Sequence, residues 1–190
     1  MSQYVDGFRR RYKEQEQNKS TVQRSLSYHI ILDCRYWSMT HTFYSPIGAV
    51  RLVEEDGSII RIELTDANAS SSAPTPLLRE AEHQITAFLR GERRQLDFPI
   101  RMMGTPFQQR VWQALQQIPY GTTRTYGEIA TAIGSPRASR AVGMACNKNP
   151  LLLIVPCHRV VGANGKLVGF SYGTEAKRWL LELESSALLI

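Results

Sequence analysis

Cysteine is scarce in this chain, and its three cysteines form no closely spaced pair. Cys34, Cys146 and Cys157 are an odd number, and none lies in a Cys-x-x-Cys arrangement. Disulfide frameworks and structural zinc sites both need such sets, so the sequence predicts neither. A reducing compartment suits this content best, and we expect a cytoplasmic protein without a bound metal.

Long apolar runs, repeats and phosphate loops are also missing. No stretch approaches the roughly twenty apolar residues of a membrane span, and no basic start followed by an apolar core marks a signal peptide. Gly162-Ala163-Asn164-Gly165 reads as a turn and not as a glycine-rich phosphate loop. We therefore expect neither a membrane protein nor a nucleotide-dependent enzyme.

Acidic residues are outnumbered, 17 against 23 basic ones, for a net charge of +6. The imbalance is concentrated between Thr105 and Gly169, where the only acidic residue is Glu128 and the basic residues are Arg110, Arg124, Arg137, Arg140, Lys148, Arg159 and Lys166. This distribution favours a polyanionic partner. A solvated basic face is the alternative interpretation.

The segment Pro156-Cys157-His158-Arg159-Val160 places a thiol beside an imidazole. It follows the apolar run Leu151 to Val155, which predicts a buried strand that carries Cys157 into a pocket. A thiol reacts as thiolate, so we expect His158, Arg159 and the flanking polar residues to lower the pKa of Cys157. An inert buried cysteine is the alternative.

Several further motifs accompany this segment in a fixed order. They are Asn149 to Val161 around the cysteine, Thr105-Pro106-Phe107-Gln108, Ile118-Pro119-Tyr120-Gly121, Thr125 to Ala130, Arg137 to Gly143, Gly169-Phe170-Ser171-Tyr172-Gly173 and Lys177 to Glu184. This set closely resembles the O6-alkylguanine-DNA alkyltransferases, also called methylated-DNA–protein-cysteine methyltransferases. The resemblance implies DNA repair by direct, irreversible transfer of an alkyl group from guanine O6 to Cys157, once per molecule and without a cofactor.

The resemblance also implies roles for single residues. Cys157 would pass its proton through a water to His158, oriented by Glu184, while Tyr126 would assist the leaving guanine and Asn149 would bond the adjacent turn. The backbone of Val155 and Ser171 would read the guanine edge. Tyr126 as a packing tyrosine and Asn149 as a turn residue before Pro150 are the structural alternatives.

A pair of short helices is expected on the DNA side. Thr125-Tyr126-Gly127-Glu128 has the spacing of a capping box, which predicts the start of a helix that ends at Gly134. A second helix is predicted from about Arg137 to Asn147. Two short helices joined by a tight turn are typical of helix-turn-helix. The second helix carries small residues together with Arg137, Ala138 and Arg140. These side chains offer little that could read base edges in the major groove. The resemblance implies minor-groove insertion, with Arg140 filling the gap left by a flipped base. Arg140 as a phosphate contact is the alternative.

The expected fold is α+β. Residues 39–101 predict a small antiparallel-sheet lobe, ribonuclease H-like by resemblance, with three strands between His41 and Leu64 and a helix from Leu77 to Arg90. Residues 104–190 predict a mainly helical, catalytic and DNA-binding lobe. Residues 1–38 read as a disordered or non-native extension ahead of a start at Met39, or else as a basic arm. We expect a monomer.

Phe170 and Tyr172 stand where some relatives have tyrosine and glycine. A bulky Tyr172 over the pocket predicts a preference for methyl over benzyl adducts, and activity on O4-alkylthymine is left open. Three other functions are compatible with parts of the sequence: a non-catalytic damage sensor, a helix-turn-helix regulator and a cysteine hydrolase. The presence of Cys157 argues against the sensor.

Overall fold

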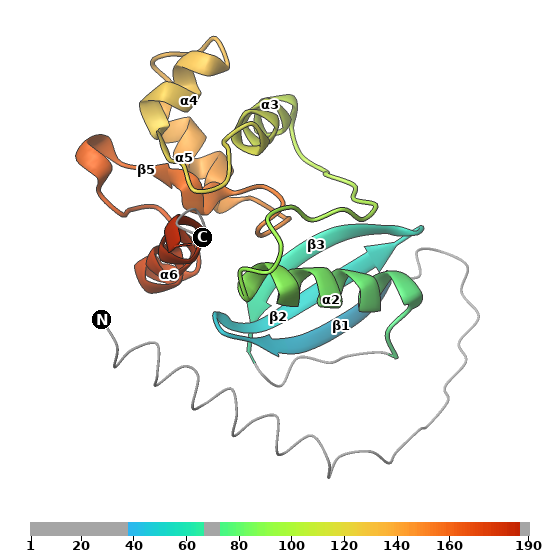
Figure 1. Cartoon of the computed structure of the whole chain (residues 1–190). Helices are drawn as coiled ribbons and strands as arrows, with labels where there is room; N and C mark the ends of the chain where they lie inside the picture. Colours follow the sequence, from blue (N-terminus) through green and yellow to red (C-terminus); the bar gives the residue numbers. More distant parts are fainter. Residues whose placement is uncertain (1–37, 67–72, 187–190) are drawn as a thin grey trace.

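The computed structural model describes residues 38–66 and 73–186. The predicted extension 1–38 lies outside these residues except for Ser38, and so do the first residues of the loop expected at 70–76. Within the described residues the fold is mixed α and β, with one three-stranded antiparallel sheet and five α-helices (Figure 1). The predicted α+β class is confirmed at this level.

The sheet consists of β1 (Ser38–Ser45), β2 (Gly48–Glu55) and β3 (Ser58–Thr65), paired in the order β1-β2-β3. Both connections are tight turns. At the second turn Asp56 and Gly57 have φ values of 49° and 68°, the left-handed conformation that an Asp-Gly hairpin turn requires. The predicted strand-turn-strand order is confirmed.

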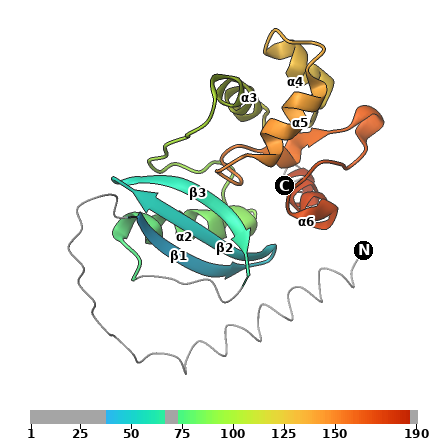
Figure 2. The ribbon, with the colours of Figure 1, turned by 180° about the vertical axis from the view of Figure 1, so that it is seen from behind.

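Helix α2 (Pro76–Leu89) covers one face of this sheet (Figures 1 and 2). It begins at Thr75, whose side chain accepts a hydrogen bond from the backbone of Leu78, and Pro76 occupies its first turn. Its buried face has helical spacing and packs on the sheet to form the core of this part of the chain; it comprises Leu78, Ala81, Gln84, Ile85, Phe88 and Leu89.

The other helices lie together beyond one edge of the sheet (Figure 1). They are α3 (Pro106–Gln116), α4 (Tyr126–Ala132), α5 (Ser139–Asn147) and α6 (Gly173–Ser186). Capping boxes start α3 at Thr105 and α4 at Thr125. Trp112 of α3 donates a hydrogen bond from its indole nitrogen to the Ala145 carbonyl at 2.9 Å, which joins α3 to α5.

Helix α5 begins two residues later than expected. The Ala138 backbone N–H bonds the Ser135 carbonyl at 2.8 Å in a turn, and Ala138 is the cap residue without a side-chain cap bond. Arg137 and Ala138 therefore precede the helix, because the turn around Pro136 uses the residues that would have formed its first turn.

The segment with Cys157 is not the continuous strand that its apolar residues predicted. Only Leu151, Leu152 and Val155 form isolated bridges, and Leu153 has a φ of 72°, so the chain reverses there. Cys157–Arg159 form a 3₁₀ turn, η2, followed by β5 (Val160–Val161), which pairs in parallel with β4 (Arg124–Thr125). A run of apolar residues indicates burial but cannot exclude such a reversal.

The two parts of the chain join along the edge of β3 that does not pair with β2. The Ile62 N–H donates to the Pro150 carbonyl at 2.8 Å, and the Leu152 N–H donates to the Ile62 carbonyl at 3.0 Å. On the same strand Ile59 exchanges two such bonds with Pro99 and Arg101. The sheet thus directly supports the segment that leads to Cys157. No described helix is long and apolar enough to cross a membrane.

Candidate active site

Cys157 lies at the start of the 3₁₀ turn and is 5% exposed. Asn149 Nδ2 donates a hydrogen bond to its Sγ at 3.3 Å. Burial raises the pKa of the thiol, and neither this bond nor the positive charge of Lys177 reverses the effect. The expectation of a lowered pKa is therefore wrong for the protein without substrate, and the resting group is the neutral thiol.

The expected helpers of Cys157 are otherwise engaged. Burial lowers the pKa of His158 in spite of its bond to Glu184, so the imidazole is neutral at physiological pH. The Arg159 guanidinium is directed at the Glu184 carboxylate. Neither side chain supplies the free positive charge that would stabilise a thiolate. A thiolate at Cys157 would therefore form only if another group took up its proton.

His158 and Glu184 form a fully buried pair. Nε2 of His158 lies 2.7 Å from Oε1 of Glu184, and both side chains have an exposed fraction of 0%. Because the carboxylate accepts this bond, Nε2 carries the hydrogen and Nδ1 is the basic atom of the ring. Nδ1 is buried and has no hydrogen-bond partner among the described residues.

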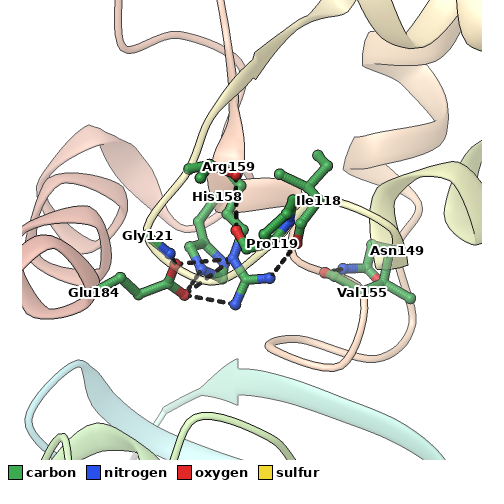
Figure 3. Close-up of polar contacts among 9 residues, drawn as sticks. Ile118, Pro119, Gly121, Asn149, Val155, His158, Arg159 and Glu184 are labelled. Atoms are coloured by element: carbon green, nitrogen blue, oxygen red, sulfur yellow. Dashed lines mark hydrogen bonds and ion pairs between the residues drawn. The ribbon is translucent and has the colours of Figure 1, made fainter. Parts of the chain in front are cut away.

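Figure 3 shows how many donors converge on Glu184. Arg159 donates from Nε at 2.9 Å and from Nη2 at 2.9 Å, and the Gly121 backbone N–H donates at 2.9 Å. Burial alone would raise the pKa of Glu184, but the bonds from His158 and Arg159 lower it to about 2. Arg159 also donates to the Ile118 carbonyl at 2.7 Å, so the carboxylate stays ionised in a fixed orientation.

Asn149 organises the reversal before Cys157. Its Nδ2 donates a hydrogen bond to the Val155 carbonyl at 2.8 Å (Figure 3). Its Oδ1 accepts a bond from the Leu151 N–H at 2.9 Å, and Nδ2 also donates to Sγ of Cys157. The Val155 carbonyl also accepts from the Cys157 N–H, and the Val155 N–H donates to Leu151. Reading of guanine by Val155 would thus have to exchange bonds that the protein makes internally.

Tyr126 lies at the start of α4 and faces the segment before α6. Its hydroxyl contacts the carbonyls of Val168 and Gly169 at 3.0 and 3.2 Å. Burial raises its pKa to about 12, with a smaller contribution from Cys146 and Cys157 when these are ionised, so it is a hydrogen-bond donor. A Cβ on Gly169 would lie 2.4 Å from this hydroxyl, and Gly169 has a φ of 67°. Only glycine permits this close approach.

Lys177 of α6 is completely buried beside these groups. Its Nζ donates to the carbonyls of Val160 and Val168, the latter at 2.7 Å, and lies 5.9 Å from the centre of the Tyr126 ring. Burial lowers its pKa, whereas Cys157 and Cys146, when ionised, act in the opposite direction. This lysine joins the two ends of the segment between β5 and α6 under the Tyr126 ring.

The residues assigned to DNA lie on the surface. Arg137 and Arg140 are exposed, Ala138 is half-buried, and Ser171 is exposed with its hydroxyl 3.4 Å from the Asn147 carbonyl. The structure brings together Cys157, His158, Glu184, Asn149 and Val155, and leaves Arg137 and Arg140 outside that cluster. Of the lysines and arginines between Thr105 and Gly169, Arg159 is buried and belongs to the cluster. The others are exposed: Arg110, Arg124, Arg137, Arg140, Lys148 and Lys166.

The sequence did not predict the roles of two charged residues near Cys157, Arg159 and Lys177. Arg159 was expected to act on Cys157 and instead binds Glu184. Lys177 received no role, although Lys177, Leu180 and Glu184 have the spacing of one helical face and are the buried residues of α6. Charged residues at core positions of an amphipathic helix were the available signal, because such residues need buried partners.

Known proteins resemble the chain over most of its length. A family model described as 6-O-methylguanine DNA methyltransferase, DNA binding domain, matches residues 106–186. The methylated-DNA–protein-cysteine methyltransferase of Methanosarcina acetivorans is 46% identical over 150 residues, which cover 76% of this chain and 96% of that protein.

Solved structures agree with this similarity. The crystal structure of Mycobacterium tuberculosis O6-methylguanine methyltransferase has a TM-score of 0.73 at 42% identity and covers 80% of this chain and 94% of its own. A crystal structure of Mycobacterium tuberculosis OGT in complex with DNA has a TM-score of 0.72 at 44% identity, covering 78% and 94%. The resemblance of the motifs is confirmed: this chain belongs to the methylated-DNA–protein-cysteine methyltransferase family.

Proposed function

We propose that this protein repairs DNA by transferring an alkyl group from O6 of guanine to Sγ of Cys157. Membership of the family supports the reaction class. The observation that carries the assignment to this site is the buried thiol one residue from an imidazole whose Nδ1 is unpartnered and whose Nε2 is held by an ionised carboxylate. This arrangement fits a nucleophile with a separate general base.

The proton of the thiol would move to Nδ1 of His158. Because the two residues are chain neighbours in a tight turn, a bridging water is the simplest route between Sγ and the ring. Glu184 stabilises the imidazolium that forms and keeps the ring in the required tautomer. The thiol is neutral at rest, and the thiolate would form only as its proton moves to His158.

In the transfer step Sγ attacks the alkyl carbon, the carbon–O6 bond breaks, and its electron pair goes to guanine. The departing base needs a donor, and the hydroxyl of Tyr126, in the motif Thr125 to Ala130, matches the family's donor. Its raised pKa keeps it protonated. It would exchange its bonds to Val168 and Gly169 for one to guanine, while the backbone of Val155 and Ser171 would read the edge of the base.

The DNA side is assigned to α4 and α5 as a helix-turn-helix. The exposed Arg137 and Arg140, with the small Ala138 at the cap of α5, favour insertion of this region into the minor groove of double-stranded DNA. Arg140 would occupy the place of a flipped O6-alkylguanine. An enzyme that removes an alkyl group from a base must first take that base out of the stack, which costs a few kcal/mol. A side chain that fills the gap lowers this cost.

We assign residues 39–101 to a ribonuclease H-like scaffold and residues 104–190 to the catalytic and DNA-binding lobe.

The product is a thioether, which has no ready route back to thiol, so each molecule would act once. The damaged DNA supplies the alkyl group, so the reaction requires no metal and no other cofactor. We expect the protein to act as a monomer in the cytoplasm, and activity on O4-alkylthymine stays a question for experiment.

The second candidate is a damage sensor or regulator that binds DNA without reaction. Helices α4 and α5 favour it as much as they favour repair, since both need DNA contacts. The buried Cys157, His158 and Glu184 favour repair over this second candidate, because a protein that only binds DNA gains nothing from an ionised carboxylate and an imidazole beside a thiol.

A repair titration tests the proposal. A duplex with one O6-methylguanine in a restriction site is mixed with increasing amounts of protein, and restored cleavage is measured. The expected amount of repaired duplex equals the amount of protein and is zero for Cys157→Ser. Repair in excess of protein would indicate turnover, and binding without repair would favour the sensor or regulator.

A further inference from the structure

The Arg159 guanidinium is fixed along its edges by hydrogen bonds. Nε and Nη2 donate to the Glu184 carboxylate at 2.9 Å, and Nη1 donates to the Ile118 carbonyl at 2.7 Å. All three nitrogens of this planar group are engaged, so its faces are left for packing. What packs on a face decides whether the plane can tilt away from Glu184.

Tyr120 supplies that packing. Its ring centre lies 5.6 Å from Cζ of Arg159 and 5.8 Å from Cζ of Arg94, within the range of cation–π contacts. Phe88 packs edge-on against the same ring, with ring centres 5.8 Å apart and planes at 78°. Phe88 belongs to α2 and Arg94 follows that helix, so the N-terminal part of the chain holds the ring that packs on Arg159.

The chain neighbours of Tyr120 hold the same ion pair through their backbone. The Ile118 carbonyl accepts the bond from Arg159, and the Gly121 N–H donates to Glu184 at 2.9 Å. The ion pair in turn fixes His158, whose Nε2 lies 2.7 Å from the Glu184 carboxylate. The short segment around Tyr120 therefore contacts the ion pair with both its backbone and its ring.

The ring of Tyr120, and not its hydroxyl, makes these contacts. The hydroxyl oxygen is buried and has no hydrogen-bond partner among the described residues. The ring also borders a cavity of about 510 Å³ between the two parts of the chain, which Phe98, Leu153 and Arg159 line as well. Because this cavity gives the Arg159 side chain room to move, a smaller side chain at position 120 would free the guanidinium.

We propose that Tyr120 is a positioning residue for alkyl transfer, whose ring keeps the Arg159 guanidinium on Glu184. The carboxylate then keeps Nδ1 of His158 available as the base for Cys157. This inference rests on the proposed function. It also gives the N-terminal part of the chain a role in the chemistry, through the two side chains that hold the ring.

Three variants separate the ring from other effects. Tyr120→Leu removes the ring and keeps an apolar side chain. Tyr120→Phe removes only the unpaired hydroxyl, so we expect the wild-type rate and no loss of melting temperature. Phe98→Leu is the matched control: it removes a ring from the wall of the same cavity, and no ring contact joins Phe98 to Tyr120 or Arg159 in the described part of the chain.

The first measurements are the single-turnover rate on a duplex with O6-methylguanine and the affinity for an unmodified duplex of the same sequence. Tyr120→Leu should lower the rate about tenfold, the size of one lost cation–π contact at a buried site, and leave the affinity unchanged. Phe98→Leu should keep the wild-type rate. An equal loss of rate in Phe98→Leu or in Tyr120→Phe would overturn the proposal, because general loosening or the hydroxyl would then explain it.

A double-mutant cycle tests the route through Glu184. If the ring acts through this carboxylate, adding Tyr120→Leu to Glu184→Gln should slow the reaction by only about twofold more. A further tenfold loss would mean an independent effect and would contradict the proposed route.

The proton signal of His158 Nε2–H, followed by NMR in protein with isotope-labelled histidine, reports the bond to Glu184 without any substrate. It should keep its downfield position in Tyr120→Phe and Phe98→Leu and move upfield in Tyr120→Leu. An unmoved signal in Tyr120→Leu would show that the ring does not position the pair.

The wild type distinguishes this inference from the proposed function. If the wild-type protein takes up no methyl group from the O6-methylguanine duplex, the repair function fails, and the NMR signal still decides whether Tyr120 positions His158. If the wild type is alkylated and Tyr120→Leu keeps both its rate and its signal, the repair function stands and the role of Tyr120 fails.

Discussion

Glu184 holds the Nε2 side of His158 at 2.7 Å, with neither side chain exposed, and thereby leaves Nδ1 as the only free basic atom of the ring. The carboxylate can do this because Arg159 and the Gly121 backbone keep it ionised and in place. The proposed chemistry of Cys157 depends on this relationship.

Glu184→Gln should slow alkyl transfer about a hundredfold or more, the usual size of a general-base effect. The amide cannot stabilise an imidazolium, and it leaves Arg159 without its ionic partner, so we also expect a loss of about 3 kcal/mol in the free energy of unfolding. Single-turnover rates and denaturant titrations measure the two effects. Glu182→Gln, an exposed change on the same helix, is the control, and a rate close to wild type in Glu184→Gln would contradict the assigned role.

The pH–rate profile should be flat between about pH 6.5 and 9, the ordinary pKa values of histidine and of cysteine. Burial lowers the pKa of His158, so the base is already neutral at pH 6.5. Burial raises the pKa of Cys157, so direct ionisation begins only above pH 9. A rate that rises tenfold per pH unit between 7 and 8.5 would instead indicate attack by a free thiolate.

Stability should fall in acid for a related reason. The pKa of His158 is lowered from 6.5 and that of Glu184 from 4.5 to about 2 on folding, so the unfolded chain binds more protons than the native one below pH 6.5. The free energy of unfolding is then greatest above pH 6.5 and decreases as the pH falls toward 2. Denaturant titrations across this range should show the decrease, and Glu184→Gln should flatten it below pH 4.5.

Lys177→Met should slow the reaction about tenfold. The two carbonyls that Nζ bonds lose a donor, at a cost of about 1–3 kcal/mol each, and the pKa of Cys157 rises further because a nearby positive charge disappears. Iodoacetamide alkylation of Cys157 against pH, followed by peptide mass spectrometry, measures this pKa. The exposed Arg178→Met is the control; an unchanged thiol pKa in Lys177→Met would reduce the lysine to a purely structural residue.

Arg140→Ala should slow repair of a duplex lesion about tenfold and affect the same lesion in a single strand far less, because a single strand has no stack to restore. Arg124→Ala, which also removes an exposed positive charge, is the control for general electrostatic attraction. Equal losses on both substrates would identify Arg140 as a phosphate contact.

Local patterns predicted much of this fold. The three strands between His41 and Leu64 and the capping box at Thr125 depend on neighbours in the chain, and the structure contains each of them. The ordered motifs also identified the family. These features need no knowledge of distant contacts.

The features that the sequence did not predict depend on contacts between distant segments. The reversal at Leu153 is fixed by Asn149 and by pairing with Ile62, neither of which an apolar run reveals. The direction of the Cys157 pKa shift follows from burial and from the engagement of Arg159 by Glu184, 25 residues away. Lys177 likewise acquires its partners only when α6 packs under the segment after β5.

The most direct test of the account is mass spectrometry of the intact protein and of its peptides after mixing with a duplex that holds one O6-methylguanine. The account predicts the gain of one methyl group, on Cys157, in an amount equal to the methylguanine lost, and no gain in Cys157→Ala. A protein that binds this duplex and gains no methyl group, or gains it at Cys146, would contradict the central claim.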